Sequence, residues 1–152
     1  MSWRILLALG VKYDYEAEYS DVITTFLEAK LKEIVYVKQP YSFINGNPKD
    51  AYRLLRALYS LKQSPREWYI TLREFLESFG YIQLTKDYSI FIYENGVVVG
   101  IYVDDILMLK LLKKVISKLK EYLDIRFKMK HLGDVSYYLG MTITRDRKNR
   151  TI

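Results

Sequence analysis

Hydrophobic residues are densest between positions 96 and 109, where two apolar runs flank the adjacent carboxylates Asp104 and Asp105. Residues 97–103 are rich in β-branched side chains and residues 106–109 are all aliphatic or Met, which is typical of strands buried in a sheet. Adjacent aspartates between strands are most often only a turn, because Asp bonds its own backbone there. However, a tip that only turns more usually carries Asn-Gly or Asp-Gly, and neighbouring carboxylates repel each other unless a cation neutralises them. The hairpin therefore predicts either a plain turn or a metal site.

Residues 64–79 show the clearest helical pattern. Ser64 is expected to cap the helix, Pro65 suits the first helical position, and Glu67 stands three residues after the serine, in capping-box register. Apolar side chains then recur at helical spacing until Gly80, which predicts one buried face.

Two further helices are expected. Residues 112–123 place apolar side chains on one face and lysines on the other. Residues 2–9 form a shorter apolar segment that begins after a serine and is expected to end at Gly10.

Alternation of polar and apolar residues predicts the remaining strands. They are expected over residues 15–21, 33–40, 81–84, 89–93, 125–129 and 135–144. Residues 22–31 are expected to be partly helical and residues 41–50 to form a loop. Residues 51–60 fit a helix or a strand equally well. The polar residues from 145 onward are expected to be frayed. Strands joined by hairpins rather than by regular βαβ units indicate one α+β domain.

Composition favours a folded protein with an anionic partner. The chain has 152 residues, is 50% hydrophobic and has fifteen tyrosines, so an ordered core is expected. Its formal charge is +6, which suits nucleic acid, although a modest positive charge can also serve solubility alone.

The residue inventory limits the possible metal chemistry. The chain has no cysteine and a single histidine, His131, so neither a thiolate site nor a multi-histidine zinc site is available. Carboxylates remain as ligands, and oxygen-only sites favour Mg²⁺ or Mn²⁺. No apolar run approaches the roughly 20 residues of a membrane span, and the amino terminus does not resemble a signal peptide, which is compatible with an intracellular location.

The chain resembles copia-type retrotransposon reverse transcriptases along nearly its whole length. Tyr102-Val103-Asp104-Asp105 is similar to the motif that marks reverse transcriptases. Further matching segments occur in the family's order: Asp21-Val22 with Phe26-Leu27, residues 35–40, residues 58–66 with Trp68-Tyr69, and Leu132-Gly133 with Tyr138-Leu139-Gly140.

This resemblance implies a right-hand polymerase palm with part of the fingers over residues 1–152, in which an antiparallel sheet packs on two main helices. It also implies an RNA-directed DNA polymerase whose partners are a primed RNA or DNA template and deoxynucleoside triphosphates. Asp21, Asp104 and Asp105 would be the catalytic and metal-binding carboxylates, with the first two as the principal ligands. Two cations about 3.5–4 Å apart can then activate the primer hydroxyl and steady the triphosphate.

The resemblance also assigns nucleotide-binding residues. Phe26 matches the aromatic residue that excludes a ribose 2′-hydroxyl, although without the family a core phenylalanine is the simpler interpretation. Gln63 matches a glutamine near the nucleotide's sugar and base, although it can equally be a polar residue before a helix.

Three more residues are candidates for nucleic-acid contact. Lys62 and Arg66 can bind phosphates, although basic residues near a helix start usually only face solvent. Tyr102 can rest against the primer terminus or simply pack on the strand. Lys128 and Lys130 are weaker candidates for assisting pyrophosphate departure, and Trp68 and His131 are assigned to structure.

Departures from the family pattern leave a second hypothesis open. Ile23, Glu28, Ala29 and Ser60 replace residues typical of the family, and the upstream fingers, the thumb and the ribonuclease H domain are expected to be absent. The alternative is a degenerate or repurposed remnant that binds nucleic acid without polymerising. A phosphoacceptor receiver domain is rejected, because its acidic pair comes near the start of the fold, whereas here only 47 residues follow Asp105.

Overall fold

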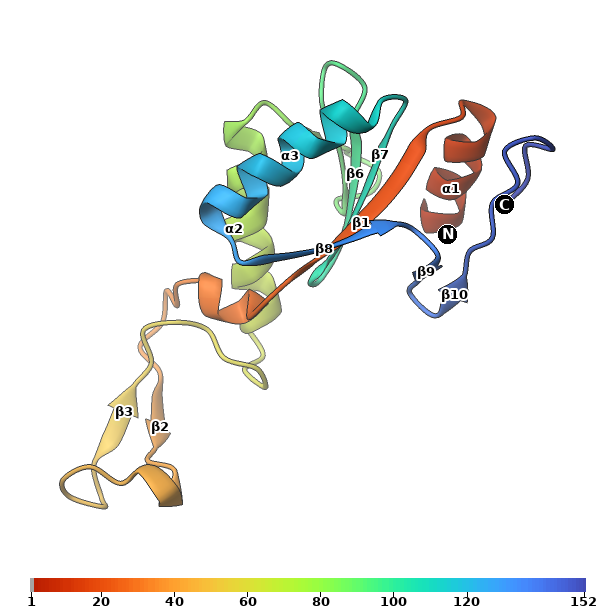
Figure 1. Ribbon diagram of the computed structural model, residues 1–152. Coiled ribbons are helices and arrows are strands. Elements are labelled where there is room, and N and C mark those ends of the chain that lie inside the picture. Colours follow the sequence, from red (N-terminus) through yellow and green to blue (C-terminus); the bar gives the residue numbers. More distant parts are fainter. Residues whose placement is uncertain (1) are drawn as a thin grey trace. The chain divides into compact units, whose positions relative to one another are not determined.

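The computed structural model describes residues 2–152, and the chain divides into two compact units (Figure 1). The first unit comprises Met1–Ile23 and Glu74–Ile152, and the second comprises Thr24–Arg73. One helix, α2 (Ser64–Ser78), begins in the second unit and ends in the first. No helix among residues 2–152 is long and apolar enough to cross a membrane.

A six-stranded antiparallel sheet forms the centre of the first unit, in the order β4-β5-β6-β7-β1-β8. Its strands are β1 (Glu16–Val22), β4 (Ile82–Gln83), β5 (Ile90–Ile92), β6 (Val98–Tyr102), β7 (Asp105–Lys110) and β8 (Met129–Asp134). The helices are α1 (Ser2–Lys12) and α3 (Lys113–Arg126), and β9 (Tyr137–Tyr138) pairs with β10 (Met141–Thr142) in a separate hairpin. This arrangement confirms the predicted α+β class and is consistent with a polymerase palm.

The two faces of the sheet are covered by different elements, as Figure 1 shows for α1 and α3. Side chains alternate along a strand, so Leu107 and Leu109 of β7 point to one face and Ile106 and Met108 to the other. The first pair packs with residues of α1, whereas α3 contacts β7 and β8 on the opposite side. Every residue of β7 from position 106 to 109 is therefore buried, which explains its continuous apolar run.

Glycine 10 is not the helix terminator that the sequence suggests. Helix α1 continues to Lys12, and Gly10 is buried where an added Cβ would lie 3.1 Å from Leu109 Cδ2. The turn that follows the helix contains Asp14, whose φ of 53° is left-handed. Gly10 is thus a packing residue, and the prediction was wrong because close packing and termination call for the same residue type.

The carboxyl-terminal predictions also need correction. Helix α3 extends to Arg126, so Ile125, expected in a strand, is helical and 78% exposed. Residues 135–144 form the β9–β10 hairpin rather than one strand, because Leu139 and Gly140 adopt positive φ angles at its turn.

The end of the chain is bonded rather than frayed. The Arg145 guanidinium donates to the Tyr15 carbonyl and, at 2.7 Å, to the Asp14 carboxylate. Arg147 donates to Asp14 at 3.1 Å and to Glu16 at 2.5 Å. These charged partners lie about 130 residues earlier in the chain, so local sequence could not reveal them.

The second unit has little regular structure before α2. It contains η1 (Thr25–Glu28), β2 (Tyr36–Lys38), η2 (Tyr41–Phe43) and β3 (Ala51–Arg53), and β2 and β3 form an antiparallel ribbon. The strand predicted over 33–40 is thus confirmed only over its middle, and the ambiguous segment 51–60 begins as a strand.

The predicted helix at residues 64–79 is confirmed, but its serine cap is not. The Ser64 hydroxyl donates to the Leu58 carbonyl at 2.5 Å, and Ser64 is fully buried inside the first turn. The serine therefore fastens the preceding loop to the helix instead of capping it.

Candidate active site

A tight turn joins β6 to β7 and carries Asp104 at its tip. Tyr102 and Asp105 are a cross-strand pair, so only Val103 and Asp104 make the turn. Val103 adopts φ of 55°, a left-handed conformation that costs a non-glycine residue about 1–2 kcal/mol. A two-residue hairpin normally needs such a conformation, and here a valine supplies it without the usual glycine.

Asp21 and Asp105 are direct neighbours on adjacent strands. Register pairing places Asp21 of β1 opposite Asp105 of β7, and cross-strand partners have Cβ atoms about 4.5–5.5 Å apart on the same face. The Val22 amide donates to the Asp104 carbonyl at 3.0 Å, which fixes the turn against the end of β1. Asp21 and the pair Asp104–Asp105, which begins 83 positions further along the chain, thus lie at the same end of the sheet.

The carboxylates perturb one another electrostatically. Burial, followed by the charge of Asp104, raises the pKa of Asp21, while Lys130 on β8 opposes this shift. Burial, followed by the charges of Asp104 and Asp21, raises the pKa of Asp105. A cation placed among these groups would remove the repulsion.

The carboxylate oxygens of Asp21, Asp104 and Asp105 are suitable ligands for a hard divalent ion, but the three side chains do not point toward a common position. Within residues 2–152, no group of three or more His, Cys, Asp or Glu side chains is close enough to hold a metal ion. Carboxylate oxygens are the ligands that Mg²⁺ and Mn²⁺ prefer, so ion binding requires the three side chains to turn toward a common point.

Aromatic rings lie on the sheet face that carries Asp21 and Asp105. Trp3 of α1 makes edge contacts with Tyr102 at 6.4 Å and with Tyr138 at 5.5 Å between ring centroids, and Tyr19 contacts Tyr138 at 6.3 Å. Tyr102 is 52% exposed beside the carboxylates. The contact with Trp3 supports a packing role for Tyr102. The exposed part of the Tyr102 ring is accessible to nucleic acid, and that contact stays a prediction.

Gly100 lets Trp3 approach the sheet. An added Cβ would lie only 2.2 Å from Trp3 Cζ3, so any larger residue would collide with the indole ring. Sequence reasoning missed this contact, although a glycine inside a β-branched run is a known sign of close approach.

Tyr138 contributes a buried hydroxyl near the carboxylates. Its side chain is 1% exposed, and the hydroxyl has no hydrogen-bond partner among the described residues. Burial, together with the charge of Asp105, raises the pKa of this phenol, which stays protonated at neutral pH. The sequence placed Tyr138 only in a family motif and gave no sign of this environment.

The other predicted site residues belong to the second unit and are described within it. Phe26 is buried in η1 and packs edge-on against Tyr59 at 4.5 Å between ring centroids. Gln63 Nε2 donates to Glu33 Oε2 at 3.3 Å, and Lys62 and Arg66 are exposed. Their predicted roles toward nucleotide and nucleic acid stay predictions.

The residues assigned to structure have structural environments. Trp68 is 1% exposed within α2. His131 on β8 joins two elements, because its Nδ1 lies 2.8 Å from Ser20 Oγ and its Nε2 lies 3.0 Å from Asp124 Oδ2.

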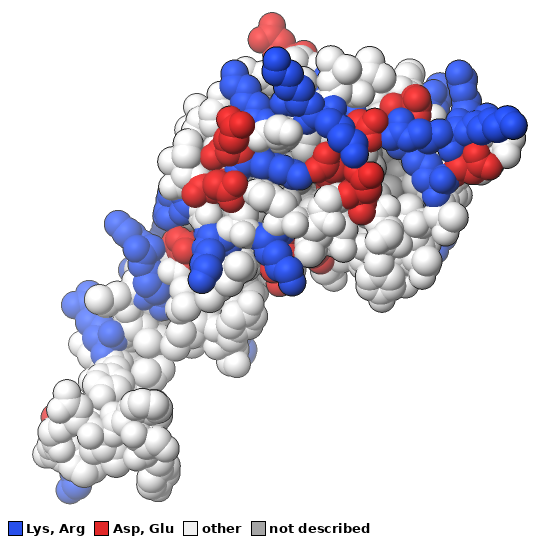
Figure 2. Space-filling model, viewed as in Figure 1, with Lys and Arg blue, Asp and Glu red and all other residues white. Residues whose placement is uncertain are grey.

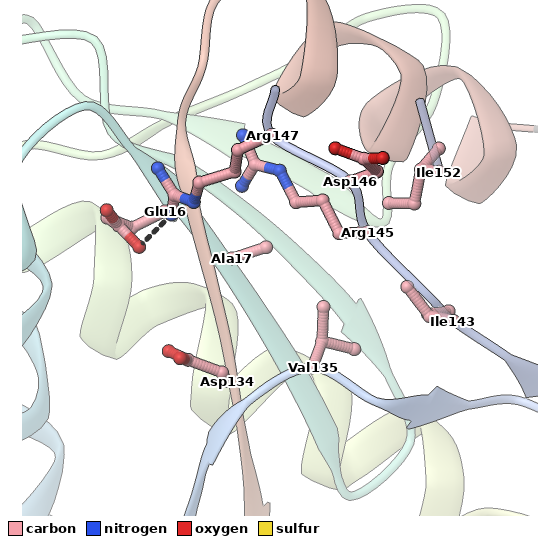
Figure 3. Close-up of a pocket in the computed structure, with 9 residues that line it drawn as sticks. All are labelled: Glu16, Ala17, Asp134, Val135, Ile143, Arg145, Asp146, Arg147 and Ile152. Carbon is pink, nitrogen blue, oxygen red and sulfur yellow. Dashed lines mark hydrogen bonds and ion pairs between the residues drawn. The ribbon is translucent and has the colours of Figure 1, made fainter. Parts of the chain in front are cut away.

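A cavity of about 610 Å³ lies at the end of β1 opposite to Asp21 (Figure 3). Its lining includes Glu16, Arg145 and Arg147, and the Arg147 guanidinium is paired with Glu16. Asp21 is five residues along β1 from Glu16, a distance of roughly 17 Å in a strand. The cavity is therefore separate from Asp21, Asp104 and Asp105. Its two arginines are already paired with acidic side chains.

Comparison with known proteins identifies the family. The family model described as reverse transcriptase (RNA-dependent DNA polymerase) matches residues 1–152. The chain belongs to this reverse transcriptase family. The resemblance to copia-type enzymes is confirmed by relatives that match nearly the whole chain.

Three of these relatives are plant polyproteins. The chain is 37% identical over 156 residues to the retrovirus-related Pol polyprotein from transposon TNT 1-94 of Nicotiana tabacum, covering 99% of the chain and 12% of the relative. It is 34% identical over 148 residues to the Pol polyprotein from transposon RE1 of Arabidopsis thaliana, and 35% identical over 152 residues to that from transposon RE2. Each of these two alignments covers 95% of this reverse transcriptase chain and 10% of the relative. The chain thus spans about a tenth of the length of these polyproteins.

Proposed function

We propose that this reverse transcriptase chain is the catalytic core of a retrotransposon RNA-directed DNA polymerase. It comprises a palm with part of the fingers, and it extends a primer on an RNA or DNA template with deoxynucleoside triphosphates. The observation that carries the proposal is the cross-strand pair Asp21–Asp105, with Asp104 in the adjoining two-residue turn.

The three carboxylates would hold two Mg²⁺ or Mn²⁺ ions. Such a pair activates the primer hydroxyl and neutralises the developing charge on the triphosphate. Asp21 and Asp104 are the principal ligands in this proposal, and Asp105 supplies supporting negative charge. The sheet holds Asp21 and Asp105 in fixed register, and the Val22–Asp104 hydrogen bond limits movement of the turn.

The remaining residues would bind and orient the substrates. Tyr102 is exposed beside the carboxylates, where its ring can support the primer terminus. In the second unit, Phe26 would exclude a ribose 2′-hydroxyl, Gln63 would contact the nucleotide, and Lys62 and Arg66 would bind phosphates. Phe26 is held by its contact with Tyr59, as a rigid steric barrier requires.

Ser60 supports the alternative function, a remnant that binds nucleic acid without polymerising. Copia-type enzymes have glycine at this position, and here Ser60 adopts φ of 76°, a conformation that strains any residue with a Cβ. The substitutions at Ile23, Glu28 and Ala29 point in the same direction.

Primer extension separates the two functions. The chain is incubated with an RNA template, a DNA primer and deoxynucleoside triphosphates, with Mg²⁺ and separately with Mn²⁺. Asp104→Asn should abolish extension, because it removes a principal ligand. Glu121→Gln, which also turns a carboxylate into an amide, at an exposed residue of α3, should retain it.

Thermal unfolding supplies an independent readout of ion binding. A ligand that binds only the folded state at 100 times its Kd stabilises it by about 2.7 kcal/mol, so Mg²⁺ or Mn²⁺ should raise the Tm of the parent and less so that of Asp104→Asn. A folded chain that binds a primed template but neither extends it nor gains stability from either ion would establish the remnant instead.

A further inference from the structure

The positive charge of the chain is concentrated in its second unit. Residues 24–73 hold nine Lys and Arg against four Asp and Glu, which gives a formal +5 of the chain's total +6. The rest of the chain is nearly neutral, and Figure 2 shows Lys and Arg interleaved with Asp and Glu around α3. An anionic partner is therefore expected to approach the second unit.

The β2–β3 ribbon presents aromatic and basic side chains on one face. We use "ribbon" for β2, β3 and the connecting residues 39–50. Tyr36 stands directly opposite Arg53, and Lys38 lies two residues further along the same face. All three are exposed, and Tyr36 is exposed to 63%. An exposed aromatic ring with basic side chains beside it has the composition of a surface that binds single-stranded nucleic acid.

The connecting loop continues this surface beyond the last cross-strand pair. A cleft of about 400 Å³ begins at Lys38 and Ala51 and is also lined by Tyr41 and Lys49. The Tyr41 side chain is 98% exposed. Aromatic and basic side chains thus alternate from the ribbon into the loop.

The loop is held in shape by one glutamine. Gln39 Nε2 donates to the carbonyls of Asn47 at 2.8 Å and Asp50 at 3.1 Å, and the Asn45 amide donates to Gln39 Oε1 at 2.7 Å. The Tyr52 hydroxyl, on the other face of the ribbon, donates to the Phe43 carbonyl at 2.9 Å. The aromatic side chains are therefore displayed on a preorganised loop, which lowers the entropy lost on binding.

We propose that this face of the ribbon, with Tyr36, Tyr41, Lys38, Lys49 and Arg53, is a binding surface for single-stranded nucleic acid. Unpaired bases stack on exposed aromatic rings, and the neighbouring Lys and Arg side chains bind the phosphates. A paired duplex hides the faces of its bases, so it cannot stack on Tyr36 or Tyr41. The proposal rests on the proposed function, in which the unpaired part of the template is the strand to be held.

Fluorescence anisotropy with a labelled oligonucleotide of roughly 12 nucleotides tests the surface, a length within the range of known single-strand sites. Oligo(U) and oligo(dT) distinguish RNA from DNA, and a blunt duplex of equal length is the third probe. The measurements are made with a chelator, so binding does not depend on divalent ions or on catalysis. Urea midpoints confirm that each variant is folded.

Tyr36→Ala should weaken single-strand binding about tenfold, the scale of one lost base stack, and Tyr36→Phe should bind like the parent because it keeps the ring. The double change Lys38→Glu/Arg53→Glu should lower the slope of log affinity against log salt by about 1.4, because each lost single-strand phosphate contact removes about 0.7. Lys86→Glu/Lys114→Glu makes the same charge change at exposed positions of the first unit, and it should have a smaller effect. Duplex affinity should respond less than single-strand affinity to Tyr36→Ala.

Any of three outcomes would refute the proposed surface. Tyr36→Ala would bind single strands like the parent, or Lys38→Glu/Arg53→Glu would weaken binding no more than Lys86→Glu/Lys114→Glu. In the third, Tyr36→Ala would lower the affinities for single strand and duplex equally. Ribbon variants that convert a dimer to a monomer with unchanged oligonucleotide affinity would show a protein interface instead. Failure of the two proposals is distinguishable. If the chain binds single strands through Tyr36 but does not extend a primer, only the proposed polymerase function is refuted. If the chain extends a primer and Tyr36→Ala binds single strands like the parent, only the proposed binding surface is refuted.

Discussion

Gly100→Ala should destabilise the first unit through a collision with Trp3. The new Cβ would lie 2.2 Å from Trp3 Cζ3, 2.9 Å from Trp3 Cη2 and 3.2 Å from Leu6 Cδ1. Carbon atoms in contact prefer separations of about 3.5–4.0 Å, so the indole ring has to withdraw by roughly 1.3 Å. It is not free to do so, because its edge contacts with Tyr102 and Tyr138 fix its position on α1.

The expected loss of stability follows from two opposing effects. Overpacking of this kind costs about 1–3 kcal/mol, since neighbouring side chains leave their preferred rotamers. Replacing a strand glycine by alanine regains about 0.5–1 kcal/mol of conformational entropy. A contact of 2.2 Å is severe, so we expect the upper half of the overpacking range, about 2–3 kcal/mol. The net loss is then about 1–2 kcal/mol, which lowers the urea midpoint by roughly 0.5–1 M at a typical m-value near 2 kcal/mol/M.

Urea unfolding followed by far-ultraviolet circular dichroism measures this loss, because the signal does not depend on Trp3. The same change is then made in a Trp3→Leu background, where the ring is gone. There, Gly100→Ala should be neutral or slightly stabilising, which gives a coupling energy of at least about 1 kcal/mol between the two positions. An equal loss in both backgrounds would show that the collision with Trp3 is not the cause.

Three further predictions concern the carboxylates, the ribbon and the buried phenol. The pKa of Asp105 is raised by burial and by Asp104 and Asp21, so the folded state loses stability as pH rises from the unfolded pKa through the raised folded pKa. Without divalent ions, Asp105→Asn should therefore have a higher Tm than the parent at pH 7, and equal Tm values at that pH would contradict the shift. Gln39→Ala removes three loop hydrogen bonds, so hydrogen exchange of the Asn45 amide should accelerate while the urea midpoint stays unchanged; a protected amide would show another anchor. Tyr138→Phe removes a buried hydroxyl without a partner among the described residues and should raise stability by about 1 kcal/mol in urea unfolding, whereas a loss would reveal a partner.

The elements with strong local patterns could be predicted from the sequence. The central hairpin has apolar strand sequences, and α2 and α3 have apolar residues at helical spacing. The structure forms these elements where the patterns predict them, because each pattern marks a buried face. Element ends were less predictable. Ile125 illustrates the reason. An apolar residue after a helix suggests the start of a strand, but Ile125 belongs to the last turn of α3, where its side chain is exposed.

Features that depend on distant contacts could not be predicted from local pattern. The acidic pair suggested a metal site, but only the resemblance to reverse transcriptases linked it to Asp21. The roles of Gly100 and Arg145 need partners far along the chain: Trp3 for the first, and Asp14 and Tyr15 for the second. The concentration of charge in residues 24–73 was present in the sequence, but it acquired meaning only once those residues formed a separate unit.

The position of β1 between β7 and β8 determines when the carboxylates can meet during synthesis. Asp21 leaves the ribosome 84 residues before its neighbour Asp105, and β8, which covers the other edge of β1, ends only at Asp134. Until then β1 has an open edge available to any other extended chain, including a second nascent copy. Closing such a long loop is slow, so an unpaired edge of β1 exposes the partly synthesised chain to aggregation. This order also ensures that the carboxylates assemble only in a chain whose sheet is nearly complete.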